Sequence, residues 1–413
     1  MIVQRTETHV IKESHPIYRW IVEECSRSKN LYNRALYIYR QAFTGNHDKI
    51  EEYKDIIKHD KFIASFALVN RMNELKDDDF CSMMKKNGAQ QIVFQVDRTM
   101  KSWFASLKSY KKDGSKFRGR PRIPSYKKKD ELNCLTYTTA DAKLQKDGTI
   151  NLSKTVKLPI HTNLTSFQQV RLVPKTGYVQ VEIIYNKEIS DSKLDQTRAI
   201  GIDLGLNNLM AITSNIGNIS SLVNGRPLKS INQYYNKRKA HLMSLLERGG
   251  LKSSKRLRRL EMKRMMKIKD YLHKISRRVV ELMYNNNIGT CFIGHNKDWK
   301  QEINIGSRNN QNFVFIPYSL LINMLRYKIE EKGGVLVELN EAYTSKCSFL
   351  DNEEICKHEV YKGKRVKRGL FLSSNKKALN ADINGSLNIL KRGMGYSFKF
   401  EDVFFRPRKI FGR

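Results

Sequence analysis

The sequence predicts a multidomain α+β protein in which a β-rich module with a helical insertion precedes an α/β domain. Its 413 residues are enough for two or three domains with separate cores. Apolar residues alternate near the N-terminus and again between residues 132 and 186, whereas residues 16–110 have helical spacing. After residue 198 the patterns follow the order strand, strand, helix, strand, helix, strand, helix, which is typical of an α/β domain.

The N-terminal half combines short strands with a long helical segment. Residues 1–10 alternate and are expected to form a strand, and residues 16–43 place apolar side chains at helical intervals. Helical spacing continues to about residue 110, and five alternating segments follow, separated by two hairpin signals, Lys146-Asp-Gly148 and Lys175-Thr-Gly177. We therefore expect a β-barrel made from residues 1–10 and 111–190, with residues 11–110 inserted as a helical domain.

The C-terminal half begins after a polar boundary near residues 188–198. A strand ending at Asp203 and a hairpin are followed by a long basic helical pair over residues 228–287 that turns at Gly249-Gly250. Then come a strand (289–294), a helix (317–332), a strand (334–339) and a helix from about residue 380. This order fits an RNase H-like layout over residues 191–343 and 372–396, interrupted by residues 344–371 and followed by a basic tail, 397–413.

Two acids lie in apolar surroundings within this α/β region. Asp203 is at the end of an apolar strand, and Asp382 is at the start of the last helix. Each alone has a simpler explanation, as a turn-capping acid or as an acid at a helix N-terminus. Together they form a pair of carboxylates of the kind that two-metal cleavage of a phosphodiester requires.

The charge of the chain indicates a partner that carries many phosphates. Lys and Arg number 76 against 41 Asp and Glu, a net charge of +35. No apolar stretch reaches the roughly 20 residues of a spanning helix, and the N-terminus has no signal-peptide pattern. Six scattered cysteines without a CxxC pair indicate a reducing compartment. We expect a bacterial cytoplasmic protein that associates with the nucleoid when bound to DNA.

Two basic segments are the candidate nucleic-acid contacts. Residues 101–129 hold eleven Lys and Arg and one acid, with Pro and Gly that forbid a regular helix at their centre. Residues 229–278 hold seventeen basic residues and three acids. A solvated surface is the simpler interpretation, but this charge density favours a face that follows phosphates. The candidates are Lys116, Arg118, Arg120, Arg122, Lys127, Lys128, Arg256, Arg258, Arg259, Lys263 and Arg264.

Motifs along nearly the whole chain, in the right order, resemble the TnpB family of transposon-encoded proteins, which are related to the type V CRISPR effectors. The motifs are residues 28–35 (SKNLYNRA), 102–104 with 116–122 (SWF and KFRGRPR), 201–205 (GIDLG), 270–276 (DYLHKIS), 343–348 (YTSKCS) and 381–384 (ADIN). The resemblance implies a wedge-type β-barrel, a helical recognition insertion and a RuvC-like nuclease domain. It also implies a guide RNA from the transposon end and cleavage of double-stranded DNA beside a short adjacent motif.

One departure from the family pattern concerns the second catalytic acid. The family places a glutamate at the end of the strand after the basic helices, where this chain reads Phe292-Ile-Gly-His-Asn. Glu341, at the tip of the next strand, is the first candidate to replace it. Asp298 is the second candidate and Glu338 the third, because Glu338 faces away from Glu341 on an alternating strand. A loop acid that pairs with nearby lysines is the simpler interpretation of Glu341.

A second departure concerns a zinc ribbon, which relatives often form from two CxxC pairs. Here residues 344–371 offer only Cys347, Cys356 and His358, whose spacing does not make a closed tetrahedral site. We expect no zinc, and a hairpin over residues 360–371 that presents basic side chains instead.

The expected function is RNA-guided cleavage of DNA, with Asp203, Glu341 and Asp382 holding two Mg²⁺ ions. Base pairing with the guide would choose the target, while the protein reads backbone shape and a short motif. The missing glutamate keeps open an alternative, a nuclease-dead RNA-guided repressor. A strand-joining transposase would share the acids but leaves the RNA-binding features unexplained.

Overall fold

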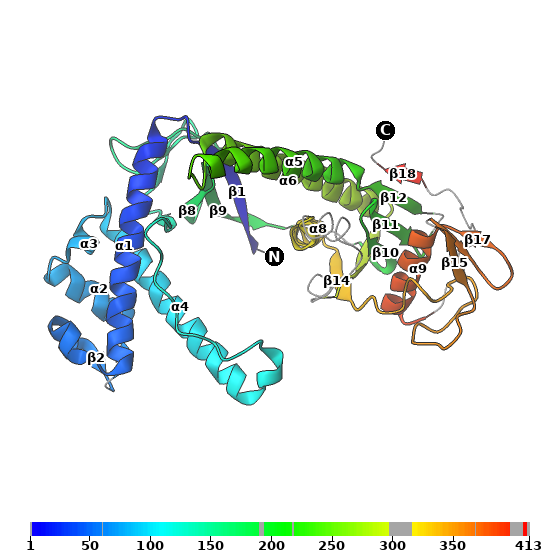
Figure 1. The fold of residues 1–413 in the computed structure, drawn as a ribbon, viewed down its shortest axis with the longest axis horizontal. Helices are drawn as coiled ribbons and strands as arrows, with labels where there is room; N and C mark the ends of the chain where they lie inside the picture. The colour runs from blue at the N-terminus through cyan, green and yellow to red at the C-terminus, as the bar shows by residue number, and fades with distance from the viewer. Residues whose placement is uncertain are drawn as a thin grey trace. The chain divides into compact units, whose positions relative to one another are not determined.

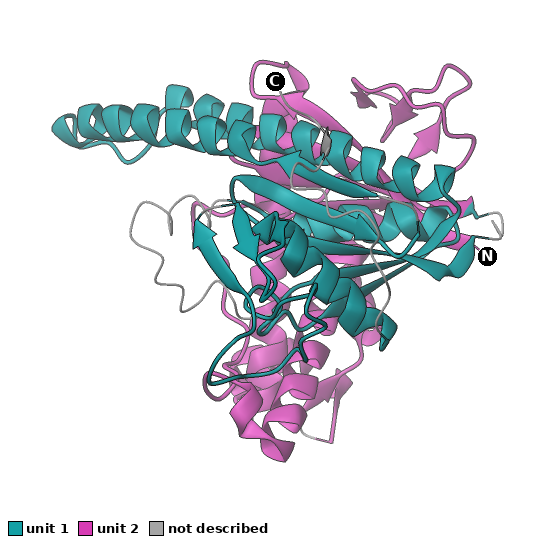
Figure 2. Cartoon of the chain, turned by 90° about the vertical axis from the view of Figure 1, so that its right-hand side faces the viewer, with its two compact units in different colours: residues 1, 188–413 teal, residues 2–187 magenta. Residues whose placement is uncertain are grey.

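The computed structural model describes residues 2–59, 61–189, 194–216, 219–296, 316–367, 369–396 and 408–410. The chain divides into two compact units, residues 2–187 and residues 188–413 (Figure 2). Each has a hydrophobic core of its own. The finer subdivision expected from the sequence stays a prediction. No helix in the described ranges is both long and apolar enough to cross a membrane.

The unit of residues 2–187 contains the expected long helices. Gly45 ends α1 with a left-handed backbone, φ 76°, which is why the helical pattern breaks there. Ile21, Leu36 and Val93 are among the side chains that pack α1 and α4 into one core. The helices are α1 (Ile17–Thr44), α2 (Ser65–Glu74), α3 (Asp78–Cys81), α4 (Lys86–Lys112) and the 3₁₀ helices η1 (His47–Ile56) and η2 (Gly114–Lys116) (Figure 1).

The strands of this unit form three separate sheets. The largest has the order β1-β9-β8-β4, and the others are β5-β6-β7 and β2-β3. Both predicted hairpin turns contain a glycine of positive φ, Gly148 and Gly177. The strands are β1 (Ile2–Lys12), β2 (Ile57–Lys58), β3 (Phe62–Ile63), β4 (Leu135–Thr138), β5 (Lys143–Leu144), β6 (Ile150–Asn151), β7 (Lys157–Leu158), β8 (Gln169–Lys175) and β9 (Tyr178–Glu188).

The closed barrel that the sequence predicts for this unit is not seen in the described residues. β1 and β4 are the two edges of the four-stranded sheet, and no pairing joins them. β5, β6 and β7 are each two residues long and pair only with one another. Strands this short leave too few backbone hydrogen bonds to close a sheet on itself.

The unit of residues 188–413 is built on a six-stranded sheet of order β14-β13-β10-β11-β12-β18. β10, β13 and β14 are parallel, while β11 runs antiparallel to β10 and β12 antiparallel to β11. The sequence predicts all of these strands except β18, which lies in the segment that it predicts to be a basic tail. Their bounds are β10 (Asp195–Leu204), β11 (Asn208–Ser214), β12 (Ser220–Asn224), β13 (Ile288–Gly294), β14 (Val335–Leu339) and β18 (Arg408–Ile410).

Helices cover this sheet on both faces. α6 and α8 pack on one face through Ile200, Ile202 and Ile293, and α9 packs on the other, against β10 and β11 (Figure 1). The basic pair predicted from the sequence is α5 and α6, which lie side by side and turn at Gly249-Gly250. The helices are α5 (Arg226–Arg248), α6 (Lys255–Asn285), α8 (Tyr318–Glu331) and α9 (Ala381–Met394).

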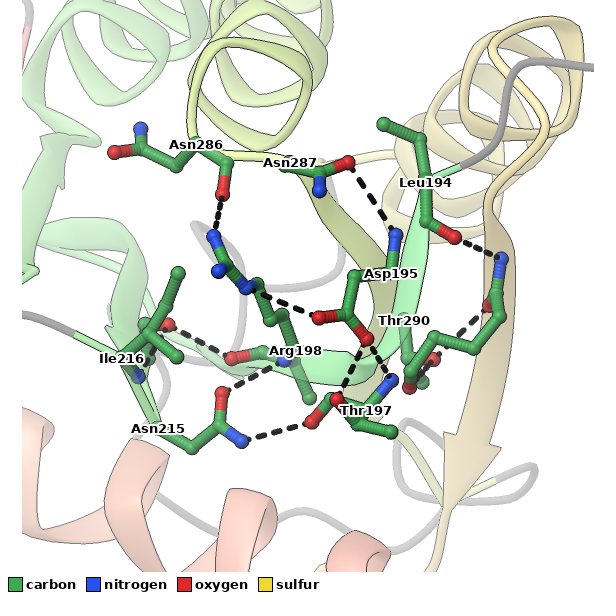
Figure 3. Close-up of polar contacts among 12 residues, drawn as sticks. Leu194, Asp195, Thr197, Arg198, Asn215, Ile216, Asn286, Asn287 and Thr290 are labelled. Carbon is green, nitrogen blue, oxygen red and sulfur yellow. Dashed lines mark hydrogen bonds and ion pairs between the residues drawn. The ribbon is translucent and has the colours of Figure 1, made fainter.

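A polar network fixes the start of β10, the strand that carries Asp203 (Figure 3). The Asp195 carboxylate accepts hydrogen bonds from the Thr197 amide (2.9 Å) and hydroxyl (2.6 Å), and it pairs with Arg198 at 3.1 Å. Arg198 in turn donates to the Asn286 carbonyl at the end of α6 (3.3 Å). These contacts hold the start of β10, eight residues before Asp203, and its pairing with β13 shifts register once, between Asp195 and Ala199.

A second small sheet, β15-β16-β17, lies in the segment between β14 and α9. Its strands are β15 (Lys364–Lys367), β16 (Leu370–Leu372) and β17 (Ala378–Leu379), and β15 and β16 form the predicted basic hairpin. The loop before it is organised by Glu353, which is 3% exposed. The Glu353 carboxylate accepts the Ser348 amide (2.7 Å) and the Lys362 amide (2.9 Å).

We expect Glu353→Ala to loosen this loop, because two amides lose their acceptor. An unsatisfied buried group costs about 1–3 kcal/mol, so exchange of the Ser348 and Lys362 amides should accelerate roughly tenfold to a hundredfold. Native-state hydrogen exchange measures this directly. The exposed Glu359→Ala removes the same charge and should leave both amides protected. Unchanged exchange in Glu353→Ala would show that the carboxylate does not organise the loop.

Candidate active site

Asp203 lies near the end of β10, on the face of the sheet that α9 covers. Gly201 is two residues earlier on the same face, and a Cβ on it would come within 2.4 Å of the Ser386 carbonyl of α9. Only glycine lets the helix pack this close to the strand. A Cβ on Gly385 would likewise come within 2.7 Å of Asp203 Oδ2. The two glycines thus bring α9 directly against the Asp203 carboxylate.

Asp382 lies in the first turn of α9. The Asn380 side chain caps the helix by accepting the amides of Asp382 (3.0 Å) and Ile383 (3.3 Å). Asp382 Oδ2 accepts a hydrogen bond from Asn208 Nδ2 (2.7 Å), and Oδ1 is 3.7 Å from an Arg365 guanidinium nitrogen. Two groups from other segments therefore hold the orientation of this carboxylate.

Glu341 lies two residues past the end of β14 and beside the end of β13. A Cβ on Gly294, the last residue of β13, would come within 3.2 Å of Glu341 Cβ. Ile389 of α9 lies closer still, with Cδ1 at 2.6 Å from that Cβ, so the absence of a side chain at position 294 leaves room for both Ile389 and Glu341. The backbone of Glu341 is fixed by its amide, which donates to Asn296 Oδ1 (3.3 Å), and by its carbonyl, which accepts from the Thr344 hydroxyl (2.8 Å).

The three carboxylates interact electrostatically. The pKa of Asp203 is raised well above its ordinary value, mainly by burial of the carboxylate and then by the negative charges of Asp382 and Glu341. Arg365 offsets part of this rise. Burial also raises the pKa of Glu341, with His295 acting against it. Tyr318, whose hydroxyl donates to the Gly205 carbonyl (2.8 Å), has a pKa raised by burial and by both Asp203 and Glu341.

The two rival candidates for the third acid are placed differently. Glu338 is engaged elsewhere, because it pairs with His295 Nδ1 (2.9 Å) and with Arg326 of α8. It is exposed and is not among the charges that raise the pKa of Asp203. Asp298 lies outside the described residues. The geometry favours Glu341 over Glu338, and the assignment stays a prediction.

The chemistry of these acids suits Mg²⁺, which prefers carboxylate oxygens. Their present spacing is wider than a metal site needs, since no three His, Cys, Asp or Glu side chains in the described ranges are close enough to share an ion. Asp382 is turned toward Asn208 and Arg365. The donor set fits the ion, and the side chains would have to rotate to converge on it.

Asp203 should make the fold less stable as pH rises when divalent ions are removed by EDTA. Its pKa is raised in the folded state, so that state binds more protons than the unfolded one above about pH 4. The contribution is therefore favourable at low pH and is lost as pH approaches the folded pKa. We expect Asp203→Asn to raise Tm near pH 7 and to flatten this slope in thermal scans. A lower Tm for Asp203→Asn than for the unchanged protein near pH 7 would show that the charged Asp203 carboxylate does not destabilise the fold.

Four residues near these acids were not singled out from the sequence. Asn208 and Arg365 contact Asp382, Gly385 faces Asp203, and Tyr318 is buried beside the pair Asp203 and Glu341. Small residues after Asp382 and an asparagine at the start of β11 are weak sequence signals of these contacts. The Asn208–Asp382 contact spans 174 positions, which no local pattern reveals.

The first basic segment is an extended stretch that lies along α1. Asn33 of α1 holds this stretch through two hydrogen bonds. The Lys127 amide donates to Asn33 Oδ1 (2.8 Å), and Asn33 Nδ2 donates to the Lys127 carbonyl (2.9 Å). Lys127 Nζ lies over the Tyr32 ring at 5.0 Å, and Lys116 pairs with Asp113 at 3.2 Å. Four of the predicted nucleic-acid contacts have exposed side chains, for which the structure describes no side-chain hydrogen bond or ion pair. They are Arg118, Arg120, Arg122 and Lys128.

The second basic segment lines a cavity of about 660 Å³ between α5 and α6. Arg264 is half-buried in its wall, where Nε donates to Asn232 Oδ1 (2.8 Å) and the guanidinium lies 4.8 Å from the Tyr235 ring centre. Its role in packing was not expected. Arg258 is not part of the lining. The lining also includes the predicted contacts Arg256, Arg259 and Lys263.

Cys347, Cys356 and His358 lie near one another but do not form a metal site of three side chains in the described part of the chain. The Cys347 thiol points to the Cys356 carbonyl (3.6 Å), and Cys356 Sγ is 3.4 Å from His358 Nε2. His358 Nε2 also lies 2.8 Å from the Glu354 carbonyl. The absence of zinc stays a prediction.

Comparison with known proteins identifies the class of this protein. Residues 179–300 match the family OrfB_IS605, described as a probable transposase, and residues 318–389 match the Cas12f1-like TNB domain. A TnpB-like protein of Acidianus two-tailed virus, ORF457, is 27% identical over 236 residues, which are 54% of this chain. The match spans 48% of that viral protein. The chain is thus similar to OrfB_IS605 and TnpB-like proteins, and the predicted resemblance is confirmed.

The fold is similar to that of Cas12f proteins. A Cas12f1–sgRNA–target DNA complex aligns over 89% of this chain and 82% of that one, with 16% identity and a TM-score of 0.50. A Cas12f ternary complex aligns over 89% of this chain and 81% of that one, with 16% identity and a TM-score of only 0.38. The first likeness confirms the mixed α+β architecture over most of the chain.

Proposed function

We propose that this protein is an RNA-guided DNA endonuclease encoded by a transposon, and that its unit of residues 188–413 is a RuvC-like nuclease domain. The observation that carries the proposal is the set of three carboxylates, Asp203, Glu341 and Asp382. They come from three distant segments and lie near one end of a sheet, where the charges of Asp382 and Glu341 help to raise the pKa of Asp203 although the three are too far apart to share an ion without rotating. Clustering acids against their mutual repulsion is typical of a cation-dependent site.

Two bound Mg²⁺ ions would supply the chemistry, activating water and stabilising the leaving 3′ oxygen of a phosphodiester. The side chains of this protein would hold and orient those ions. Asp203 is the central carboxylate, placed by the pairing of β10 within the sheet. Asn208 holds Asp382 at the start of β11, from which the carboxylate would rotate toward an ion, and Arg365 offsets part of the rise in the pKa of Asp203. Glycines 294 and 385 provide the room in which Glu341 and Asp203 meet.

The two basic segments would bind a guide RNA and a double-stranded DNA target. Arg118, Arg120 and Arg122 form one exposed run, and the cavity between α5 and α6 adds another set of cations. Such faces follow sugar-phosphate backbones without reading sequence, and guide pairing supplies the choice of target. The similar Cas12f1 structure is itself described as a complex with sgRNA and target DNA. A wedge role for the sheet β1-β9-β8-β4 belongs to the same proposal.

Co-expression with the transposon end tests this function. The protein should copurify with RNA, and the complex should cut a matched plasmid in Mg²⁺ but not in EDTA. A non-matching plasmid should stay intact. Guided binding without any cutting would instead support the nuclease-dead repressor, which the glycine at position 294 favours. Cutting without RNA would contradict the guided mechanism.

A further inference from the structure

A second cavity, in the unit of residues 2–187, is independent of the acidic site. It has a volume of about 460 Å³ and lies where the end of α1, the middle of α4 and residues 58–59 and 61–66 meet. Nothing in the proposed cleavage reaction uses it. Its walls combine aromatic rings with a polar group at one side and lysines at the rim.

The aromatic wall carries phenylalanines that are not covered by the fold. Phe62 is 50% exposed and Phe66 is 70% exposed. Phe62 lies 5.8 Å from the Phe104 ring, which in turn lies 5.3 Å from Phe43, so the rings form a continuous surface. Exposed aromatic rings arranged in this way are platforms on which nucleic-acid bases stack.

The polar side of the cavity contains a hydroxyl without a partner. Tyr39 is 6% exposed, and its hydroxyl makes no hydrogen bond to any described residue. Asp97 also lines the cavity and accepts a hydrogen bond from Lys101 Nζ (2.7 Å). Buried polar groups are nearly always satisfied, so an unpaired hydroxyl in the wall of a cavity indicates a ligand with a polar edge.

Exposed lysines in the lining favour a phosphate-bearing ligand. Lys58 and Lys61 line the cavity and are exposed, whereas Lys101 is paired with Asp97. An apolar peptide would gain little from these charges, whereas the phosphates on either side of a base would pair with them.

We propose that this cavity takes one unpaired base of a single-stranded nucleic acid, with the base stacked on the aromatic rings and its edge facing Asp97 and Tyr39. Guanine fits best. Its N1–H and N2–H donate side by side to a carboxylate, and its O6 accepts from the Tyr39 hydroxyl. Adenine, cytosine and uracil each lack one of these groups. RNA and DNA share this chemistry, and the experiment distinguishes them.

The test measures binding of the full chain to short oligonucleotides that carry one base among abasic sites, in parallel RNA and DNA series. Fluorescence anisotropy should show guanine binding roughly tenfold more tightly than an all-abasic strand of equal charge, in at least one series. Phe62→Leu should abolish this preference and Phe62→Trp should keep it. Tyr39→Phe should reduce the preference while raising Tm of the free protein, because it removes an unsatisfied hydroxyl.

Charge-matched variants separate base recognition from general attraction. Asp97→Asn should lose the preference for guanine over adenine. Asp48→Asn removes the same charge from a side chain that is 98% exposed and outside the cavity, and should keep it. Equal affinity for guanine and abasic strands in both series would overturn the proposal. So would an equal loss of preference in Asp97→Asn and Asp48→Asn.

Discussion

Asp203→Asn is expected to abolish target cleavage while leaving guide binding intact. The amide keeps the size of the carboxylate but removes the charge that a cation needs at the centre of the three acids. Metal-assisted steps contribute several kcal/mol, and each 1.4 kcal/mol is tenfold in rate, so the loss should be about a thousandfold or more. Single-turnover cleavage of a matched plasmid by the purified complex measures it.

A matched control separates chemistry from charge. Asp270→Asn neutralises an exposed acid of α6, 61% exposed and paired with Lys274. It should cut at the normal rate. Both variants should copurify with the same amount of RNA. Cleavage by Asp203→Asn within tenfold of the unchanged protein would remove Asp203 from the site.

The second large effect concerns the displaced acid. Glu341→Gln should lower the cleavage rate by roughly a hundredfold or more, because it removes a cation ligand beside Asp203. Glu338→Gln should cut almost normally, since Glu338 is engaged by His295 and Arg326. The same plasmid assay compares them. Loss of activity in Asp298→Asn, with Glu341→Gln unaffected, would transfer the role to Asp298.

A double variant tests the displacement itself. A Cβ at position 294 would come within 2.6 Å of Ile389 Cδ1 and within 3.2 Å of Glu341 Cβ, so Gly294→Glu alone should disturb the packing of α9 and crowd Glu341. Gly294→Glu combined with Glu341→Gly moves the carboxylate to the adjacent strand end and should cut better than either single variant. If the pair is no better than Gly294→Glu alone, the two positions do not share one function.

The elements of residues 195–394 could be predicted because each has its own local signal. The apolar run ending at Asp203 is buried on the side of Ile200 and Ile202, and Gly45 and Gly249-Gly250 interrupt helices where a break was expected. Asp203 and Asp382 stood out since acids are rare in such surroundings. These signals need only a few neighbouring residues.

The features that the sequence did not reveal depend on contacts between residues far apart in the chain. The closed barrel is not seen because β1, which pairs with β9, would also have to pair with β4 at the other edge of the sheet, and alternation does not specify partners. The contacts of Arg264 with Asn232 and Tyr235 have no local signal in the sequence, and its predicted contact with a phosphate stays a prediction. The Asn208–Asp382 contact likewise exists only once the sheet and α9 have formed.

The close approach of Gly294 to Glu341 has a consequence for how such a site can arise. A side chain at 294 would first displace Ile389 of α9, whose Cδ1 lies 2.6 Å from a Cβ there, and would crowd Glu341 Cβ at 3.2 Å. Moving the acid between these two positions therefore also requires α9 to repack against the end of β13.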